Sequence, residues 1–283
     1  MNPRALAVSW AKRGVKLALL APAMWARERE PGLFVLIYHR VGAGQGREMD
    51  LPVGRFAQHM RMLRSRADVV GLTDGLARLE GGRPARDMVA VTFDDGYREV
   101  YTHAWPVLRD LRIPATVFLP TGFMEGTAPA PIREGAAVRG EPPAPLTWDQ
   151  VGEMAGSGLV DVGSHSVTHT DYDRLSRDRA EEECAASRDL LVARTGAAVD
   201  VFAYPRAVVA HEDVVAAHYR YAVAADGVKN LAPELDPHRL ARTPVRGSDG
   251  TFFFRQRLQG MAPLEDRLYA RLRGAGAVRE RRS

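Results

Sequence analysis

A short apolar run at residues 88–93 ends directly in two adjacent carboxylates and a glycine, Asp94-Asp95-Gly96. Such a run, bounded by turn-forming residues, is typical of a strand that is buried on both faces of a parallel sheet. The two acids then lie at the carboxyl end of the strand, the edge where open α/β sheets and α/β barrels bind ligands. Neighbouring strand residues point to opposite faces, so both acids can serve one site only where the chain leaves the strand, a departure that Gly96 permits.

Asp94 and Asp95 also fit a purely structural role. Aspartate is a favoured N-cap, and residues 97–111 have the periodicity of a helix that the acids could cap. Two histidines that follow a later strand favour a functional site over a cap.

Strand and helix patterns alternate along the chain, as a parallel α/β architecture requires. The patterns predict strands at residues 32–38, 68–71, 88–93, 115–119, 159–162, 199–204 and 221–224, with an extended piece at 239–245. Helices are predicted directly after Pro52, after an N-cap at Thr73, at 97–111, from an N-cap at Thr147 to Gly156, and at 177–194 and 211–218.

The length of 283 residues and an apolar content of 46% suit a single α/β barrel domain, which we assign to residues 31–262. Residues 124–146 are rich in Gly, Ala and Pro and have no periodicity, so we interpret them as an insertion over the mouth of the site. The single cysteine, Cys184, excludes an intrachain disulfide and a four-cysteine zinc site.

The basic charge is concentrated at the two ends of the chain. The whole sequence carries +4, residues 1–30 carry +4, and the predicted basic helix and tail at 263–283 carry +3, which leaves residues 31–262 at about −3. This distribution argues against a nucleic-acid-binding face on the domain at residues 31–262.

Residues 15–26 are apolar apart from Lys16 and are too short to span a bilayer. They resemble a weak signal peptide, with Ala21-Pro22-Ala23 as a cleavage triplet. The alternative is a basic amphipathic helix on an anionic membrane surface, with Trp25 at the interface. We favour the second interpretation, with peripheral membrane contact through the basic termini. A cytoplasmic or peripheral inner-membrane location is then expected rather than a secreted or periplasmic one.

His165 and His169 directly follow the predicted strand at 159–162. On a single helical turn, residues four apart face the same way, and two such imidazoles leave room for a carboxylate and a water on one metal ion. Three protein ligands with an open position describe a catalytic metal site. The alternative is a pair of polar loop residues bonded to the backbone, but both this strand and the one before Asp95 end at the same rim.

These residues resemble the signatures of the polysaccharide deacetylases, the carbohydrate esterase family 4 or NodB-homology group. The signatures are Thr92-Phe93-Asp94-Asp95-Gly96-Tyr97 and His165-Ser166-Val167-Thr168-His169, and the resemblance extends over residues 33–245. Phe202-Ala203-Tyr204-Pro205 and Leu36-Ile37-Tyr38-His39-Arg40-Val41 are similar to the circularly permuted branch that contains the poly-N-acetylglucosamine deacetylases. The resemblance implies a distorted, incomplete (β/α) barrel of the α/β class and a divalent metal, most often Zn2+.

The resemblance assigns Asp95, His165 and His169 as metal ligands and Asp94 as the general base. Two free adjacent carboxylates repel each other, but neutralising one on a cation leaves the other ionised and available. The general acid of most relatives is a histidine in a Leu-x-His motif, which is missing here, since His238 lies in a predicted turn. The permuted order places the acid in the first strand, which matches His39, and a histidine suits proton transfer near neutral pH.

The chain departs from the family pattern after Tyr204-Pro205, where Arg206 and Ala207 replace an aromatic residue and a glycine. Tyr204, Pro205 and Arg206 are expected to line the sugar pocket, and a backbone N–H there still serves as an oxyanion donor. Arg206 is either a contact for an anionic substrate group or a surface residue. Ala203 replaces an arginine that orients the base in many relatives, and Arg242 is the candidate replacement.

The leading function hypothesis is metal-dependent N-deacetylation of N-acetylhexosamine units in a polysaccharide or its lipid-linked precursor. A second hypothesis keeps the metal site but makes the protein a deformylase of a lipid-linked sugar or an amidase on a non-carbohydrate amide. A third, from another class, is a catalytically silent glycan-binding or membrane-assembly protein.

Overall fold

A computed structural model describes residues 30–44, 48–131, 143–225 and 229–258. The predicted N-terminal segment up to residue 29, the middle of the insertion and the basic C-terminal helix lie outside these ranges. Within the described residues, no helix combines the length and apolar character needed to cross a bilayer.

The described chain is built around a curled sheet of eight strands in the order β10-β1-β5-β6-β7-β8-β9, with β4 pairing with β5 beside this path. Every strand pair in it is parallel. The strands are β1 (Leu33–Tyr38), β4 (Asp68–Val69), β5 (Met88–Phe93), β6 (Ala115–Leu119), β7 (Val160–Ser164), β8 (Val201–Ala203), β9 (Tyr221–Val223) and β10 (Thr243–Pro244). This half-barrel confirms the predicted fold class, a distorted (β/α) barrel.

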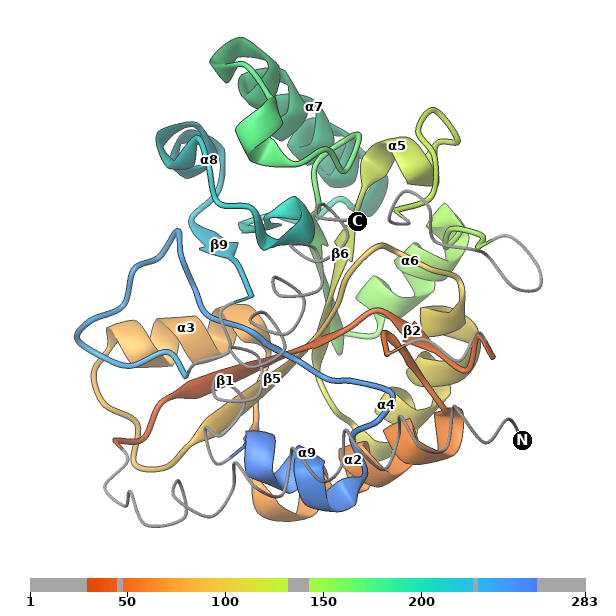
Figure 1. Cartoon of the computed structure of the whole chain (residues 1–283), viewed down its shortest axis with the longest axis vertical. Coiled ribbons are helices and arrows are strands. Elements are labelled where there is room, and N and C mark those ends of the chain that lie inside the picture. Colours follow the sequence, from red (N-terminus) through yellow and green to blue (C-terminus); the bar gives the residue numbers. More distant parts are fainter. Residues whose placement is uncertain (1–29, 45–47, 132–142, 226–228, 259–283) are drawn as a thin grey trace, which may run out of the picture.

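Helices cover the outside of the sheet and connect its parallel strands (Figure 1). They are α2 (Val53–Arg66), α3 (Leu72–Glu80), α4 (Trp105–Leu111), α5 (Thr121–Met124), α6 (Trp148–Gly156), α7 (Arg177–Thr195), α8 (Glu212–His218) and α9 (Thr251–Arg257). Short helical turns η2 (Tyr172–Arg174) and η3 (Pro205–Ala207) follow β7 and β8. The alternation of strand and helix is the one that the hydrophobic periodicity predicts.

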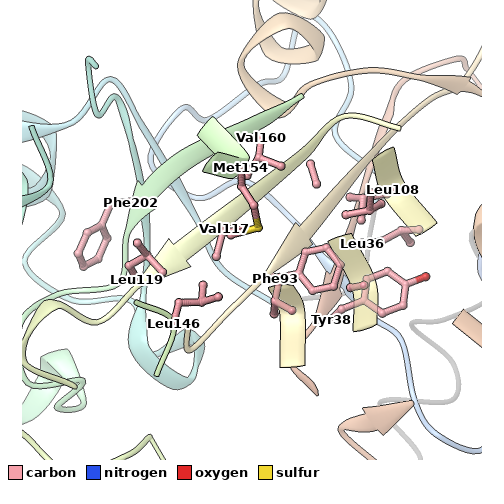
Figure 2. Close-up of a cluster of buried hydrophobic side chains, with 14 of the residues drawn as sticks. Leu36, Tyr38, Phe93, Leu108, Val117, Leu119, Leu146, Met154, Val160 and Phe202 are labelled. Atoms are coloured by element: carbon pink, nitrogen blue, oxygen red, sulfur yellow. The ribbon is translucent and has the colours of Figure 1, made fainter. Parts of the chain in front are cut away.

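The central strands β1 and β5 bury both of their faces. Phe34, Leu36 and Tyr38 join one large apolar cluster, whereas Leu33 and Val35 join a second cluster on the other face. The larger cluster also takes side chains from β6, β7, β8 and the helices, and Figure 2 shows part of it around Phe93, Val117 and Phe202. A strand buried on both faces needs an uninterrupted apolar run, which is the pattern at 33–38 and 88–93.

The helix predicted at 97–111 forms in two parts. Asp95 and Gly96 form a turn, Tyr97 forms an isolated bridge with Pro145, and a π-helical turn η1 (Val100–Ala104) precedes α4. The Trp105 backbone N–H donates to the Val100 carbonyl, five residues back, and Pro106 in the next position has no N–H to donate. The missing donor interrupts the regular ladder here, and a wide π turn takes its place.

The predicted helix caps have mixed outcomes. Thr147 forms the predicted N-cap of α6, with Gln150 completing a capping box. Thr73 was expected to cap α3, but the helix already begins at Leu72 after Gly71, and no side chain caps it. The sequence pattern also did not predict α9 or the two-residue pair of β2 (Arg40–Val41) and β3 (Asp50–Leu51). Such short elements depend on tertiary contacts more than on local preference.

We expect Gly163→Ala to lower the free energy of unfolding by about 1–3 kcal/mol, the range for overpacking a close-packed core. A β-carbon at Gly163 in β7 would lie 2.4 Å from the ring of Phe118, its partner in β6. Gly152→Ala is the matched control, because a β-carbon on this residue of α6 meets nothing within 4 Å. It should raise stability by about 0.5–1 kcal/mol. Urea unfolding of the two variants measures both effects, and equal stabilities would contradict the prediction.

Candidate metal centre

Asp94 and Asp95 leave β5 through a sharp change of backbone direction. Asp95 and Gly96 both have positive φ, 71° and 61°. An aspartate tolerates this left-handed conformation better than most residues, and glycine adopts it without steric cost. The change places both carboxylates on the same side of the sheet edge, where the two side chains are buried, at 6% and 7% exposure. Neither aspartate caps a helix.

His165 and His169 lie on a loop directly after β7. The structure contradicts the expectation that they share a helical turn, since Ser166 and His169 have positive φ values of 66° and 57°. The left-handed residues curl the loop so that the two imidazoles meet edge to face, with Nε2 atoms 3.2 Å apart. The convergence expected from the spacing is therefore present, produced by a different backbone.

Three side chains form a buried group able to hold a metal: Asp95, His165 and His169. Asp95 Oδ1 lies 3.6 Å from His165 Nε2 and 3.3 Å from His169 Nε2. Around a tetrahedral zinc with ligands at about 2.0–2.1 Å, any two ligand atoms are about 3.4 Å apart. The three donor atoms are therefore spaced like three corners of one coordination tetrahedron.

The hydrogen bond on the far side of His165 fixes which ring nitrogen faces the group. His165 Nδ1 lies 2.7 Å from the Ala203 carbonyl of β8, and a carbonyl oxygen only accepts, so Nδ1 carries the proton. Nε2 then presents a lone pair toward Asp95 and His169. Metal-ligating histidines usually donate their other N–H in this way, so the donor set fits a divalent cation.

Burial and interactions with neighbouring groups shift the pKa values of Asp95 and His169 in opposite directions. Burial alone would raise the pKa of Asp95, but the adjacent imidazoles of His165 and His169, when protonated, outweigh it and lower the pKa of this carboxyl far below its usual range. Burial also lowers the pKa of His169, against the stabilising hydrogen bond to Asp95. An ionised aspartate beside a neutral histidine is the protonation state that a metal cation selects.

Arg242 forms a salt bridge with Asp94 from the neighbouring edge of the sheet. Its guanidinium donates to both carboxylate oxygens, at 2.7 and 2.8 Å, in a bidentate pair that is 1% exposed on the arginine side. Burial would raise the pKa of Asp94, but the Arg242 charge and its hydrogen bonds lower it. Arg242 also donates to the Ala224 carbonyl and lies over the Phe118 ring, so its own orientation is fixed. The arginine proposed as a replacement for Ala203 does contact the expected base.

His39 lies at the end of β1, beside both aspartates. Tyr38 pairs with Phe93 across β1 and β5, and the Asp94 backbone N–H donates to the Tyr38 carbonyl at 2.9 Å. The charge of His39 lowers the pKa of Asp94 and of Asp95, although burial is the larger influence on both. His39 Nδ1 is buried without a hydrogen-bond partner in the described chain. His238, in contrast, bonds to the Tyr219 carbonyl from a turn.

The segment after β8 lies against the loop of the second histidine. Tyr204 and Pro205 are buried, and the Tyr204 ring packs edge to face with Tyr172 and Phe202. Arg206 donates to Asp171 at 2.6 Å and to the His169 carbonyl at 3.3 Å, so its charge is already paired. Ala207 has a φ of 59°, a left-handed conformation that glycine adopts without steric cost, which agrees with the glycine that the resemblance implies at this position.

The two ends of the insertion are attached to the Asp94-Asp95 motif itself. The Tyr97 hydroxyl donates to the Pro131 carbonyl, and the Arg98 backbone N–H donates to the Ala144 carbonyl. The Leu146 backbone N–H in turn donates to the Gly96 carbonyl at 2.8 Å. The insertion therefore leaves and rejoins the domain next to the candidate metal centre.

Glu183 on α7 is a site residue that the sequence analysis did not identify. It is 1% exposed and accepts hydrogen bonds from the backbone of Val167 and Thr168, inside the histidine loop. One signal was available: Glu183 occupies the same helix face as the buried Ala180, Cys184, Ser187 and Leu191. A carboxylate on a buried helix face needs partners, and a nearby loop supplies them.

Comparison with known proteins identifies the family. A family model described as "Polysaccharide deacetylase" matches residues 81–223, half of the chain, and covers both the aspartate and histidine motifs. The Bacillus subtilis protein YxkH, named as a polysaccharide deacetylase, is 26% identical over 184 residues, which are 64% of this chain and 59% of that protein. A poly-beta-1,6-N-acetyl-D-glucosamine N-deacetylase of Escherichia coli is 29% identical over 154 residues, 53% of this chain and 22% of that protein.

Solved structures show the same fold. IcaB from Ammonifex degensii superposes with a TM-score of 0.66 at 24% identity, over 83% of this chain and 98% of that one. The Streptococcus pyogenes deacetylase PplD gives a TM-score of 0.68 at 21% identity, over 81% of this chain and 99% of that one. This chain spans less than two thirds of the length of the curated relatives given above. The family model, together with this shared half-barrel, shows that the chain belongs to the polysaccharide deacetylase family.

Proposed function

We propose that this protein is a metal-dependent hydrolase that removes N-acetyl groups from N-acetylhexosamine units of a polysaccharide or its lipid-linked precursor. The proposal rests on the observation that the adjacent residues Asp94 and Asp95 have different partners. Asp95 faces two histidine nitrogens, whereas Asp94 is bound by Arg242 beside them. One acid is thus equipped to hold a cation, and its neighbour is left to handle protons.

Asp95, His165 and His169 would hold the cation, for which we propose Zn2+ because one carboxylate and two imidazoles suit it. A zinc ion bound there would supply Lewis-acid chemistry: it would polarise an amide carbonyl and lower the pKa of a water molecule.

Asp94 acts as the general base in this proposal. It accepts a proton from the attacking water as the new C–O bond forms, and Arg242 keeps its carboxylate ionised and aimed at the site. Asp94 Oδ2 also lies 4.0 Å from His165 Nε2, so the base adjoins the metal ligands. A backbone N–H near Tyr204 and Pro205 is the proposed donor to the oxyanion.

His39 acts as the general acid. When the C–N bond breaks, the departing amine of the sugar needs a proton, and a histidine that borders both aspartates is placed to donate it. Its place at the end of β1, next to β5, is the one that a permuted order of the family motifs would give. The products are acetate and a free amino sugar.

The name of the Escherichia coli relative supports an N-acetylglucosamine polymer as substrate. A panel of N-acetylated glycans and lipid-linked sugars, assayed for acetate with and without a chelator, tests this. Formate release from an N-formylated lipid-linked sugar alone would favour the deformylase, whereas metal binding with no product would favour a silent glycan-binding protein. We propose contact with the inner membrane through the basic termini, which membrane fractionation would test.

Substitution of the proposed base and of a proposed metal ligand should affect zinc binding and activity differently. Asp94→Asn should retain about one zinc per chain but lower the rate of acetate release by roughly 10²- to 10⁴-fold, the usual contribution of a general base. His169→Ala should lose both zinc and activity, because only two ligands remain. Elemental analysis and acetate release measure the two quantities, and wild-type activity in either variant would contradict the proposal.

His39→Ala should slow acetate release from N-acetylglucosamine oligomers by roughly 10²- to 10⁴-fold without loss of zinc. The defect should shrink on an acetanilide with an electron-poor ring, since that leaving amine needs less help from an acid. His218→Ala is the control, because that histidine pairs with Glu181 on α7. An equal loss on both substrates would contradict the role of His39 as the acid.

Arg242→Gln should move the acidic limb of the pH profile of kcat/KM to higher pH. The guanidinium lowers the pKa of Asp94, so its removal raises that pKa, and the base stays protonated and inactive up to a higher pH. Arg239→Gln, which alters an exposed pair with Glu212, is the control and should leave the limb in place. An unshifted acidic limb in Arg242→Gln would count against the assignment of Asp94 as the base.

A further inference from the structure

Glu183 is a buried carboxylate whose partners lie in the histidine loop. Its side chain is 1% exposed on a helix face that otherwise carries small or apolar groups. Burying a carboxylate costs several kcal/mol unless hydrogen bonds replace its lost hydration. The identity of those hydrogen-bond donors therefore shows which part of the fold depends on Glu183.

Three of the donors come from two consecutive loop residues. Glu183 Oε2 accepts from the backbone N–H groups of Val167 and Thr168, both at 2.8 Å, and Oε1 accepts from the Thr168 hydroxyl at 2.8 Å. Arg179 adds a longer contact of 3.3 Å from one turn earlier in α7. Charge-assisted hydrogen bonds of this length are about twice as strong as neutral ones.

Val167 and Thr168 lie between the two histidines, in a loop that local preferences do not favour. Ser166 and His169, on either side of this pair, both have positive φ, and each non-glycine residue in that conformation costs about 1–2 kcal/mol. Hydrogen bonds from Ser166 N to Ser164 Oγ and from His169 N to Ser166 Oγ close the ends of the loop. Glu183 is the partner of the two backbone N–H groups in the middle.

We propose that Glu183 is the positioning residue of the metal centre, which holds the loop in the conformation that brings His165 and His169 together. This inference rests on the proposed metal site but not on the substrate. Within the described residues, Glu183 forms no hydrogen bond with either histidine side chain, so it acts through the backbone of Val167 and Thr168. Without it, the loop relaxes from its two left-handed residues, and the imidazoles no longer meet at 3.2 Å.

Glu182 provides a matched control. It precedes Glu183 on α7 and pairs with the same arginine, since Arg179 Nη1 donates to Glu182 at 2.6 Å. Glu182 is, however, 65% exposed, and its pair with Arg179 contributes little. Glu183→Ala and Glu182→Ala therefore remove the same group from the same helix, and only the first leaves the loop without its acceptor. Glu183→Gln keeps one acceptor oxygen and serves as the conservative variant.

The experiment measures zinc affinity by chelator competition and amide hydrogen exchange in the metal-free protein. Glu183→Ala should weaken zinc binding at least about tenfold relative to Glu182→Ala, the usual effect of losing a group that supports metal ligands. Glu183→Gln should fall between them. Exchange at Val167 and Thr168 should accelerate in Glu183→Ala, while amides of β5 such as Val91 keep their protection. A merely structural role would lower protection throughout the domain.

Equal zinc affinity and equal exchange at Val167 and Thr168 in the two alanine variants would overturn the inference. If Glu183→Ala does not fold, the same comparison between Glu183→Gln and Glu182→Gln decides it. Failure of the proposed function looks different, because a wild-type protein that releases no acetate still reports on Glu183 through zinc affinity. A wild-type protein that binds no zinc still reports on it through amide exchange.

Discussion

The in-register parallel pairing of β1 with β5 is the constraint on which the site depends. Because Tyr38 pairs with Phe93, the two strands end together, and the residues that follow them, His39 and Asp94, emerge side by side. The pairing of β6 with β7 does the same for the histidine loop, since the His165 backbone N–H donates to the Leu119 carbonyl. A slip of one residue would turn these side chains to the other face of the sheet.

Electrostatic pairing then gives the two adjacent aspartates different environments. Asp94 is gripped by an arginine from the strand edge near β10, and Asp95 faces imidazoles from the β7 loop. Each carboxylate is buried, so each needs its partner, and the partners arrive from opposite sides of β5. Asp94 and Asp95, although adjacent in sequence, therefore have different chemical environments. Arg206 and Glu183 complete the arrangement by bonding to the loop backbone and not to the histidine ring nitrogens.

Sequence patterns predicted the features that depend on periodicity and on strand ends. The buried strands at 33–38 and 88–93, and the emergence of Asp94, Asp95, His165 and His169 at one rim, follow from apolar runs that end in polar residues. The helical turn assigned to the histidines was wrong, because two residues adopt positive φ where neither is glycine. Local serine hydrogen bonds offset part of that cost, but Glu183, which accepts three further hydrogen bonds from the loop, is in a different element.

Contacts between residues far apart in sequence were also difficult to predict. Arg242 was identifiable as a candidate from the absence of an arginine at Ala203, but its salt bridge with Asp94 joins residues 148 positions apart and depends on the pairing of β10 with β1. The start of α3 at Leu72 and the π turn before α4 also went unpredicted, since they depend on the backbone hydrogen bonds that form in the fold and not on hydrophobic periodicity. Hydrophobic periodicity thus predicts the strands and helices, whereas the strained loop and the residues that support it are visible only in the three-dimensional structure.

The attachment of the insertion to Gly96, Tyr97 and Arg98 has an evolutionary consequence. Its two described ends are bonded to residues within three positions of the motif, so both ends are held beside Gly96 whatever the length of the chain between them. Lengthening such a loop is inexpensive, at roughly 0.6 kcal/mol for each doubling. Insertions and deletions in this segment can therefore change the surface around the carboxyl end of the sheet without changing the register of the strands. Relatives could diverge in substrate range through this segment without repacking a single core residue.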